Sequence, residues 1–72
     1  MMIQHPHEKT VVNLDQVAEF YVYVNELVFV FADGGIDEEH WLFHRQELAY
    51  RAFERICVGV RDGEPLVHLR MY

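Results

Sequence analysis

The sequence lacks several side chains on which common enzyme chemistry depends. It contains no serine, one threonine (Thr10), one lysine (Lys9) and one cysteine (Cys57). Serine nucleophiles and P-loop phosphate binding are therefore excluded, and only Lys9 is left for Schiff-base chemistry. A single cysteine also excludes a disulfide within the chain. We expect a non-enzymatic protein without a cofactor, rather than an ordinary hydrolase, kinase or aldolase.

Long apolar runs are also missing. No stretch reaches the roughly 18 apolar residues that a membrane-spanning helix needs. His5, Pro6 and His7 stand where a signal peptide has its apolar segment, and a lone cysteine fits a reducing compartment. The sequence therefore predicts a cytoplasmic protein that does not bind membranes.

Basic residues are few, with six Lys and Arg against twelve Asp and Glu and a net charge of -6. Because affinity for nucleic acid comes largely from cations that neutralise phosphates, direct binding to nucleic acid is not expected.

The chain is short, at 72 residues, yet 51% of them are hydrophobic. A domain of this size buries only about 60% of the surface that its unfolded chain exposes. Without disulfides, its marginal core needs tight packing, a metal ion or a second subunit.

Two β-rich runs, Val17–Val24 and Leu27–Ala32, predict a hairpin with Asn25-Glu26 as its loop. This loop pairs large apolar residues on one face of the hairpin. The predicted pairs are Val24 with Leu27, Val22 with Phe29 and Phe20 with Phe31. The opposite face is largely apolar as well and needs a cover of its own. It carries Val17, Glu19, Tyr21, Tyr23, Val28, Val30 and Ala32.

The middle of the chain allows two interpretations after a turn at Asp33-Gly34-Gly35. In the first, His40–His44 is a third strand with Trp41 and Phe43 on one side. In the second, Asp37 caps one long helix that runs to Ile56. In either case, apolar residues at helical spacing predict a helix over Arg45–Ile56. This stripe consists of Leu48, Ala49, Ala52, Phe53 and Ile56.

The C-terminal residues predict a second hairpin, with strands over Cys57–Arg61 and Leu66–Tyr72 and a turn at Asp62-Gly63. The fold class is α+β, a small antiparallel β-sheet in the order β-β-(β)-α-β-β that is packed on one face by a single amphipathic helix. Residues 1–10 show no periodicity and are expected to form a mobile N-terminal segment, followed by a single domain over residues 11–72.

Histidine and cysteine supply the candidate metal-binding and nucleophilic groups. The spacing of His40 and His44 places both imidazoles on one side of a strand or of a helix, and His68 is a possible third ligand. A metal- or small-ligand-binding regulator that uses these histidines is therefore an alternative function, although EHWLFH is not a known zinc pattern. For Cys57 we expect the common role of a buried structural thiol.

A run of acidic residues begins at the predicted turn and ends next to the predicted third strand. It consists of Asp33, Asp37, Glu38 and Glu39, next to Trp41. A clustered acidic edge on a small protein can imitate nucleic-acid phosphates and block a basic groove on a partner, as small phage-encoded inhibitors do. The alternative is that the run is a solvated loop.

The surplus of apolar surface leads to the main hypothesis for function. We expect one helix to cover one face of the sheet, which leaves the other face for an interface. The interface candidates are Tyr21, Tyr23, Val28, Val30 and Trp41. The sequence thus predicts an acidic protein–protein interaction module that forms a homodimer and binds a larger partner, unless the C-terminal hairpin covers this face within one chain.

Overall fold

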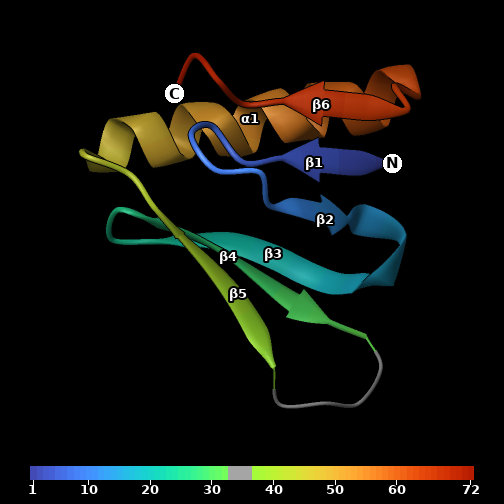
Figure 1. The fold of residues 1–72 in the computed structure, drawn as a ribbon, viewed down its shortest axis with the longest axis horizontal. Coiled ribbons are helices and arrows are strands. Elements are labelled where there is room, and N and C mark those ends of the chain that lie inside the picture. Colours follow the sequence, from blue (N-terminus) through green and yellow to red (C-terminus); the bar gives the residue numbers. More distant parts are fainter. Residues whose placement is uncertain (33–36) are drawn as a thin grey trace.

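The computed structural model describes residues 1–32 and 37–72 and has an α+β fold with two small sheets and one helix (Figure 1). The predicted Asp33-Gly34-Gly35 turn lies outside these residues. One sheet has the strand order β2-β1-β6 and the other the order β3-β4-β5. The elements are β1 (Met2–Gln4), β2 (Val11–Asn13), the 3-10 helix η1 (Leu14–Gln16), β3 (Val17–Tyr23), β4 (Glu26–Phe31), β5 (Glu38–Leu42), α1 (Gln46–Asp62) and β6 (Leu66–His68). The α+β prediction is confirmed.

The predicted hairpin is present as β3 and β4, but its loop lies one residue earlier, at Val24-Asn25. Asn25 is fixed by Phe43, because its carbonyl accepts the Phe43 N–H at 2.8 Å and its side-chain amide donates to the Phe43 carbonyl at 2.8 Å. Val24 takes the left-handed conformation that this loop requires, with φ 57°. The shift changes each cross-strand partner by two residues, so Phe20 pairs with Phe29 and both remain on the predicted face.

Of the two interpretations of the middle segment, the strand is correct, but it begins and ends two residues earlier than the predicted His40–His44, at Glu38 and Leu42. β5 pairs antiparallel with β4, and Trp41 and Phe43 point into the core while His40, Leu42 and His44 are exposed. The period-two alternation of this segment therefore outweighs the capping signal at Asp37.

The prediction of a C-terminal hairpin is wrong, because the helix continues beyond Ile56 to Asp62. Gly59 falls three residues after Ile56 and extends the buried face of α1. Gly63 ends the helix with φ 68°, and its N–H bonds to the carbonyls of Gly59 and Val60. Only Leu66–His68 form a strand after the helix, and this strand pairs parallel to β1.

The expected mobile segment over residues 1–10 is instead part of the fold. β1 is the central strand of its sheet, between β2 and β6, and Ile3 is fully buried. The Met2 N–H donates to the Pro65 carbonyl at 2.9 Å, and the Leu69 N–H donates to the Gln4 carbonyl at 3.2 Å. A three-residue strand with one buried side chain is too short to produce a recognisable period.

The core lies where α1 meets the inner faces of both sheets. Phe53 of α1 packs on Phe20 of β3, with ring centroids 5.0 Å apart. The fully or almost fully buried residues of this core are Ile3, Val12, Leu27, Phe29, Trp41, Phe43, Ala49, Ala52, Ile56, Val67 and Leu69. Within the described part of the chain, α1 is too short and too polar to cross a membrane.

Gly59 permits the close approach of α1 to β6. A Cβ atom at this position would lie 2.6 Å from Cγ2 of Val67 and 2.6 Å from Cε of Met1. The Met1 side chain is flexible and can move, but Val67 is fully buried and β-branched. The backbone of Gly59 therefore sets the distance between the helix and the first sheet.

We predict that Gly59→Ala destabilises the protein by about 1–2 kcal/mol, because overpacking outweighs the gain in helix propensity. Urea unfolding followed by circular dichroism measures this change. Val60→Ala, at the exposed neighbouring position, is the matched control and should leave stability nearly unchanged. A Gly59→Ala variant that is more stable than wild type would contradict the prediction.

Candidate functional site

The face of the β3-β4-β5 sheet that points away from α1, here called the outer face, is the candidate site. Cross-strand pairing arranges its side chains in three rows, because paired residues point to the same side of a sheet. The rows are Glu19–Val30–Glu38, Tyr21–Val28–His40 and Tyr23–Glu26–Leu42. The helix packs on the opposite side, where Phe20, Leu27 and Phe29 lie.

Large apolar side chains are exposed on this face. Tyr21 is 38% exposed, Tyr23 65% and Leu42 68%, and Val24 in the hairpin loop is also exposed. The prediction of Val28 as an exposed interface residue is wrong, since it is only 1% exposed and lies between Tyr21 and His40 in the central row. Val30 is partly buried. The exposed apolar surface is therefore carried by the two edge strands and the hairpin loop.

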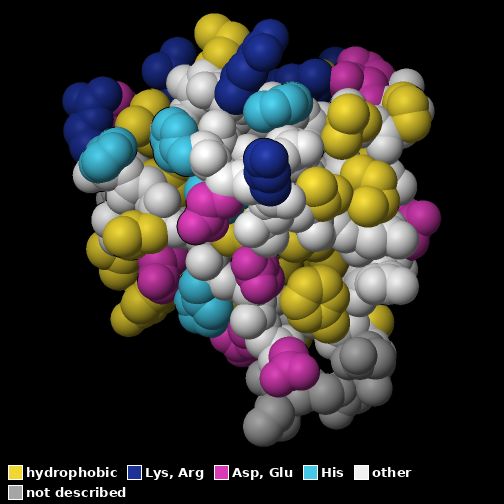
Figure 2. Space-filling model, in the orientation of Figure 1, with side chains coloured by type: hydrophobic (Ala, Val, Ile, Leu, Met, Phe, Trp, Pro, Cys, Tyr) yellow, Lys and Arg dark blue, Asp and Glu magenta, His cyan; other side chains and the backbone are white. Residues whose placement is uncertain are grey.

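The described rows of the outer face contain three carboxylates and no lysine or arginine, and His40 is their one group that can carry a positive charge. The carboxylates belong to Glu19, Glu26 and Glu38, and the sequence has no lysine or arginine between Lys9 and Arg45. Figure 2 shows Lys and Arg side chains gathered over the α1 and β6 end of the molecule, whereas the part of the view occupied by the β3-β4-β5 sheet has acidic side chains and histidine. The surface is therefore a mixed tyrosine and aliphatic patch surrounded by negative charge.

His40 lies between two of these carboxylates. Its Nε2 is 2.8 Å from Oε2 of Glu38 and its Nδ1 is 3.4 Å from Oε2 of Glu26. Hydrogen bonding to Glu38, and then to Glu26, raises the pKa of His40 above its ordinary value of 6.5. Protonation of His40 therefore reduces the negative charge of the outer face.

Trp41, predicted as an interface residue, is buried in the core. It is 1% exposed, and its Nε1 donates to Oε2 of Glu39 at 3.0 Å. Its ring contacts those of Phe29 and His5, with centroids 4.8 and 4.9 Å away. The predicted acidic patch is divided accordingly. Glu38 lies on the outer face, Glu39 faces inward, Asp37 is exposed, and Asp33 lies outside the described residues.

His5 is a buried polar residue that the sequence analysis missed. Its Nδ1 accepts the backbone N–H groups of His7 and Glu8, each at 3.0 Å. Nδ1 is therefore unprotonated in this fold, and the ring is neutral with its proton on Nε2, 3.4 Å from Oε2 of Glu8. Burial lowers the pKa of His5 below 6.5, and the nearby Glu8 opposes this shift. The HPHE turn and Trp41 thus give His5 a structural role.

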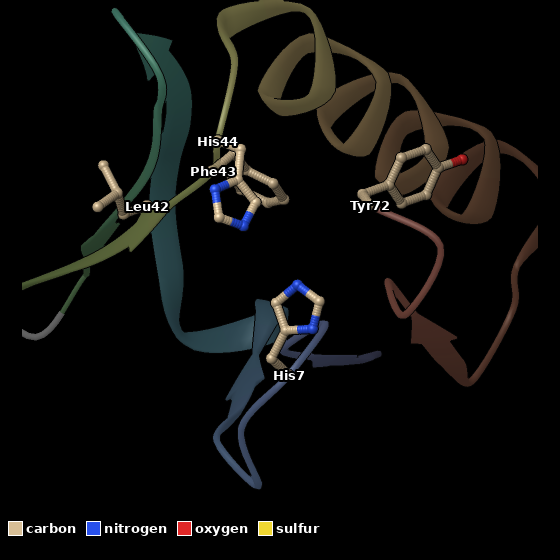
Figure 3. A pocket seen from close by; sticks show the side chains of 5 residues that line it. All are labelled: His7, Leu42, Phe43, His44 and Tyr72. Atoms are coloured by element: carbon tan, nitrogen blue, oxygen red, sulfur yellow. The ribbon is translucent and has the colours of Figure 1, made fainter.

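The structure does not bring His40, His44 and His68 together as a metal site. His40 lies on the outer face, His68 on β6, and His44 after β5, where it lines a cavity of about 80 Å³ with His7, Leu42, Phe43 and Tyr72 (Figure 3). His7 and His44 point toward each other across this cavity. In residues 1–32 and 37–72, no three His, Cys, Asp or Glu side chains are grouped to hold a metal ion. Cys57 is exposed on α1, not buried as expected.

Comparisons with family models, curated proteins and solved structures found no match for this chain. The outer face therefore has to be interpreted from its own chemistry.

We predict that His5 titrates below pH 6.5 and His40 above it, as measured by NMR of the imidazole rings. Because the pKa of His5 is lowered on folding, its contribution to stability is present above 6.5 and is lost as pH falls below 6.5 toward the folded pKa. The sign is opposite for His40, whose stabilising contribution is present below 6.5 and is lost as pH rises through its folded pKa.

The double variant Glu26→Gln/Glu38→Gln is the control for this assignment. It should move the His40 midpoint back toward 6.5 and leave the His5 midpoint in place, because His40 contacts these two carboxylates and neither of them contributes to the pKa of His5. A His5 midpoint at or above 6.5 would show that the Nδ1 contacts do not persist in solution.

Proposed function

We propose that this chain is a small, non-enzymatic protein–protein interaction module. It binds a larger partner through its outer face, and it self-associates through a different surface. The observation that carries the proposal is the exposure of Tyr21, Tyr23 and Leu42 on a sheet face that the helix does not cover. Tyrosine is enriched in interfaces because it combines apolar area with a hydroxyl group that tolerates partial contact with water.

The charges define the chemistry of the partner. Since Glu19, Glu26 and Glu38 surround the apolar side chains and the described rows of this face contain no lysine or arginine, the complementary surface has an apolar centre flanked by lysine or arginine. A second copy of the same face is a poor match, because it would bring carboxylates close to carboxylates. We therefore propose that the outer face binds a basic partner and that self-association uses another surface of the chain.

A partner whose basic groove binds nucleic acid is a second candidate of this kind. It is favoured by the segment from Thr10 to His44, which has seven acidic residues and no lysine or arginine. In this case the chain occupies the groove as a competitor of nucleic acid and does not itself bind phosphates. We place the protein in the cytoplasm, where the exposed thiol of Cys57 remains reduced.

We predict that Tyr23→Ser/Leu42→Ser weakens partner binding about tenfold or more, since central aromatic and apolar contacts supply most of the affinity of an interface. The partner is first isolated by cross-linking to the wild-type chain, and its affinity for each variant is then measured by calorimetry. Tyr50→Ser/Met71→Ser is the matched control, because these side chains are exposed outside the outer face. Equal losses in the two variants, or none in either, would contradict the assignment.

Salt dependence tests the charges separately. Glu19→Gln/Glu38→Gln should reduce the dependence of affinity on ionic strength, because carboxylates at the rim of an interface act through screened electrostatics. A nucleic-acid competitor is distinguished by displacement of nucleic acid from the isolated partner. Affinity that does not change with salt in the wild-type chain would rule out a basic partner.

A further inference from the structure

β3 forms an open edge of the second sheet. The strand order is β3-β4-β5, so β3 has a paired neighbour on one side only. Ala18, Glu19, Tyr21 and Tyr23 of this strand are exposed, whereas the central strand β4 buries Leu27, Val28 and Phe29. The free side of β3 is therefore available to a further strand.

The hydrogen-bonding register shows which backbone groups this edge presents. Tyr23 and Glu26 flank a two-residue loop and form a hydrogen-bonded pair, and such pairs alternate along an antiparallel ladder. Tyr21 and Tyr23 therefore bond to β4, whereas the N–H and C=O groups of Phe20 and Val22 point away from it. The hydrogen bond from the Phe43 N–H to the Asn25 carbonyl agrees with this alternation. It shows that the backbone groups of odd-numbered residues point toward β5, so those of the even-numbered residues Glu26 and Val28 point toward β3.

Within the described residues, the backbone groups of Phe20 and Val22 have no partner in another segment. Unpaired backbone groups along an edge strand are a template for pairing with another chain.

The other edge strands in the described part of the chain are shorter or more strongly charged. β5 carries Glu38, Glu39 and His40 among its five residues. β2 and β6 have three residues each, and β6 follows Pro65. β3 has seven residues with Glu19 as its single charge, and its one irregularity lies at the far end, between Val17 and Glu19. The regular stretch from Glu19 to Tyr23 is thus the edge with the least protection against pairing.

We propose that two copies of this chain pair antiparallel through β3, with Tyr21 of one copy opposite Tyr21 of the other. This proposal rests on the self-association stated above and names the surface that mediates it. Two identical edges meet in this way around a two-fold axis, which closes the assembly as a dimer. Phe20 of each copy then exchanges backbone hydrogen bonds with Val22 of the other, and the two sheets form one of six strands.

This register suits the side chains as well as the backbone. Glu19 of one copy lies opposite Tyr23 of the other, so the only charge of the strand does not meet its own copy. The pairing keeps both outer faces on the same side of the joined sheet, since the two-fold axis is perpendicular to it. A dimer therefore presents two adjoining outer faces to a partner.

Cysteine cross-linking in a Cys57→Ser background tests this register. Tyr21→Cys should form a disulfide-linked dimer with oxidised glutathione, because residues at the axis form a close, non-hydrogen-bonded pair. Tyr23→Cys is the matched control and should form much less dimer, although Tyr23 is the more exposed of the two residues. Disulfide formation by random collision would give more dimer for Tyr23→Cys than for Tyr21→Cys, and that result would overturn the proposal.

Mass and amide exchange test the wild-type chain directly. Sedimentation equilibrium at about 100 µM should give twice the chain mass of 8.6 kDa. The amides of Phe20 and Val22 should exchange at least about tenfold more slowly at this concentration than after dilution to the monomer, with the β4-bonded amides of Tyr21 and Tyr23 as internal controls. A chain that stays at 8.6 kDa, or a dimer whose Phe20 and Val22 amides remain unprotected, would overturn the proposal.

The two proposals fail in different ways. Leu42→Ser lies on β5, at the other edge of the sheet from β3, so it should weaken partner binding and leave the dimer intact. A monomeric wild-type chain whose partner binding is still weakened by Leu42→Ser overturns the dimer alone. Protection of Phe20 and Val22 in the monomeric chain only when a partner is added would assign the edge to a strand of that partner and overturn pairing with a second copy.

Discussion

The fold depends on the contact of one helix with two sheets. α1 presents Ala49, Ala52 and Gly59 at its buried face, and these small residues let the strands approach its backbone closely. Ile56 is buried in the same core, and Phe53 packs on Phe20 of β3. This helix packs against the inner faces of both sheets, and no helix or strand of residues 1–32 and 37–72 covers the outer face. The exposed tyrosines are thus a consequence of how the core is built.

Sequence patterns predicted the elements whose side chains alternate or repeat over several residues. The two faces of the β3-β4 hairpin, the inward side of β5 and the first part of α1 follow from such patterns. The position of the hairpin loop does not, because Asn25 and Phe43, which lie far apart in the sequence, each donate a hydrogen bond to the other. The second half of α1 was missed since Cys57, Val58 and Val60 have the composition of a strand, and the local preference is overridden by packing against β6.

The candidate site was predicted in part. Tyr21 and Tyr23 are exposed as expected, whereas Trp41 and Val28 are buried. Trp41 is buried because β5 turns it toward His5 and Phe29, and the sequence gives no sign that residues near the N-terminus reach this position. Val28 lies between its cross-strand neighbours Tyr21 and His40, and the register of the sheet decides which residues these neighbours are. The burial of a single residue is thus determined by the side chains packed around it, and these can come from segments that are distant in sequence.

The parallel pair of β1 and β6 joins Met2 to Leu66, from opposite ends of the described chain. During synthesis on the ribosome, the residues of β1 are made before those of β6. Ile3 and Val12 lie on the inner face of this sheet. Its third strand, β6, has not been made while the residues between β2 and β6 are synthesised. Contacts between such distant segments form slowly, because a long loop must close before they bring any stabilisation. The β2-β1-β6 sheet can therefore be completed only after β6 has been synthesised, and until then Ile3 and Val12 lack one of the strands of their sheet.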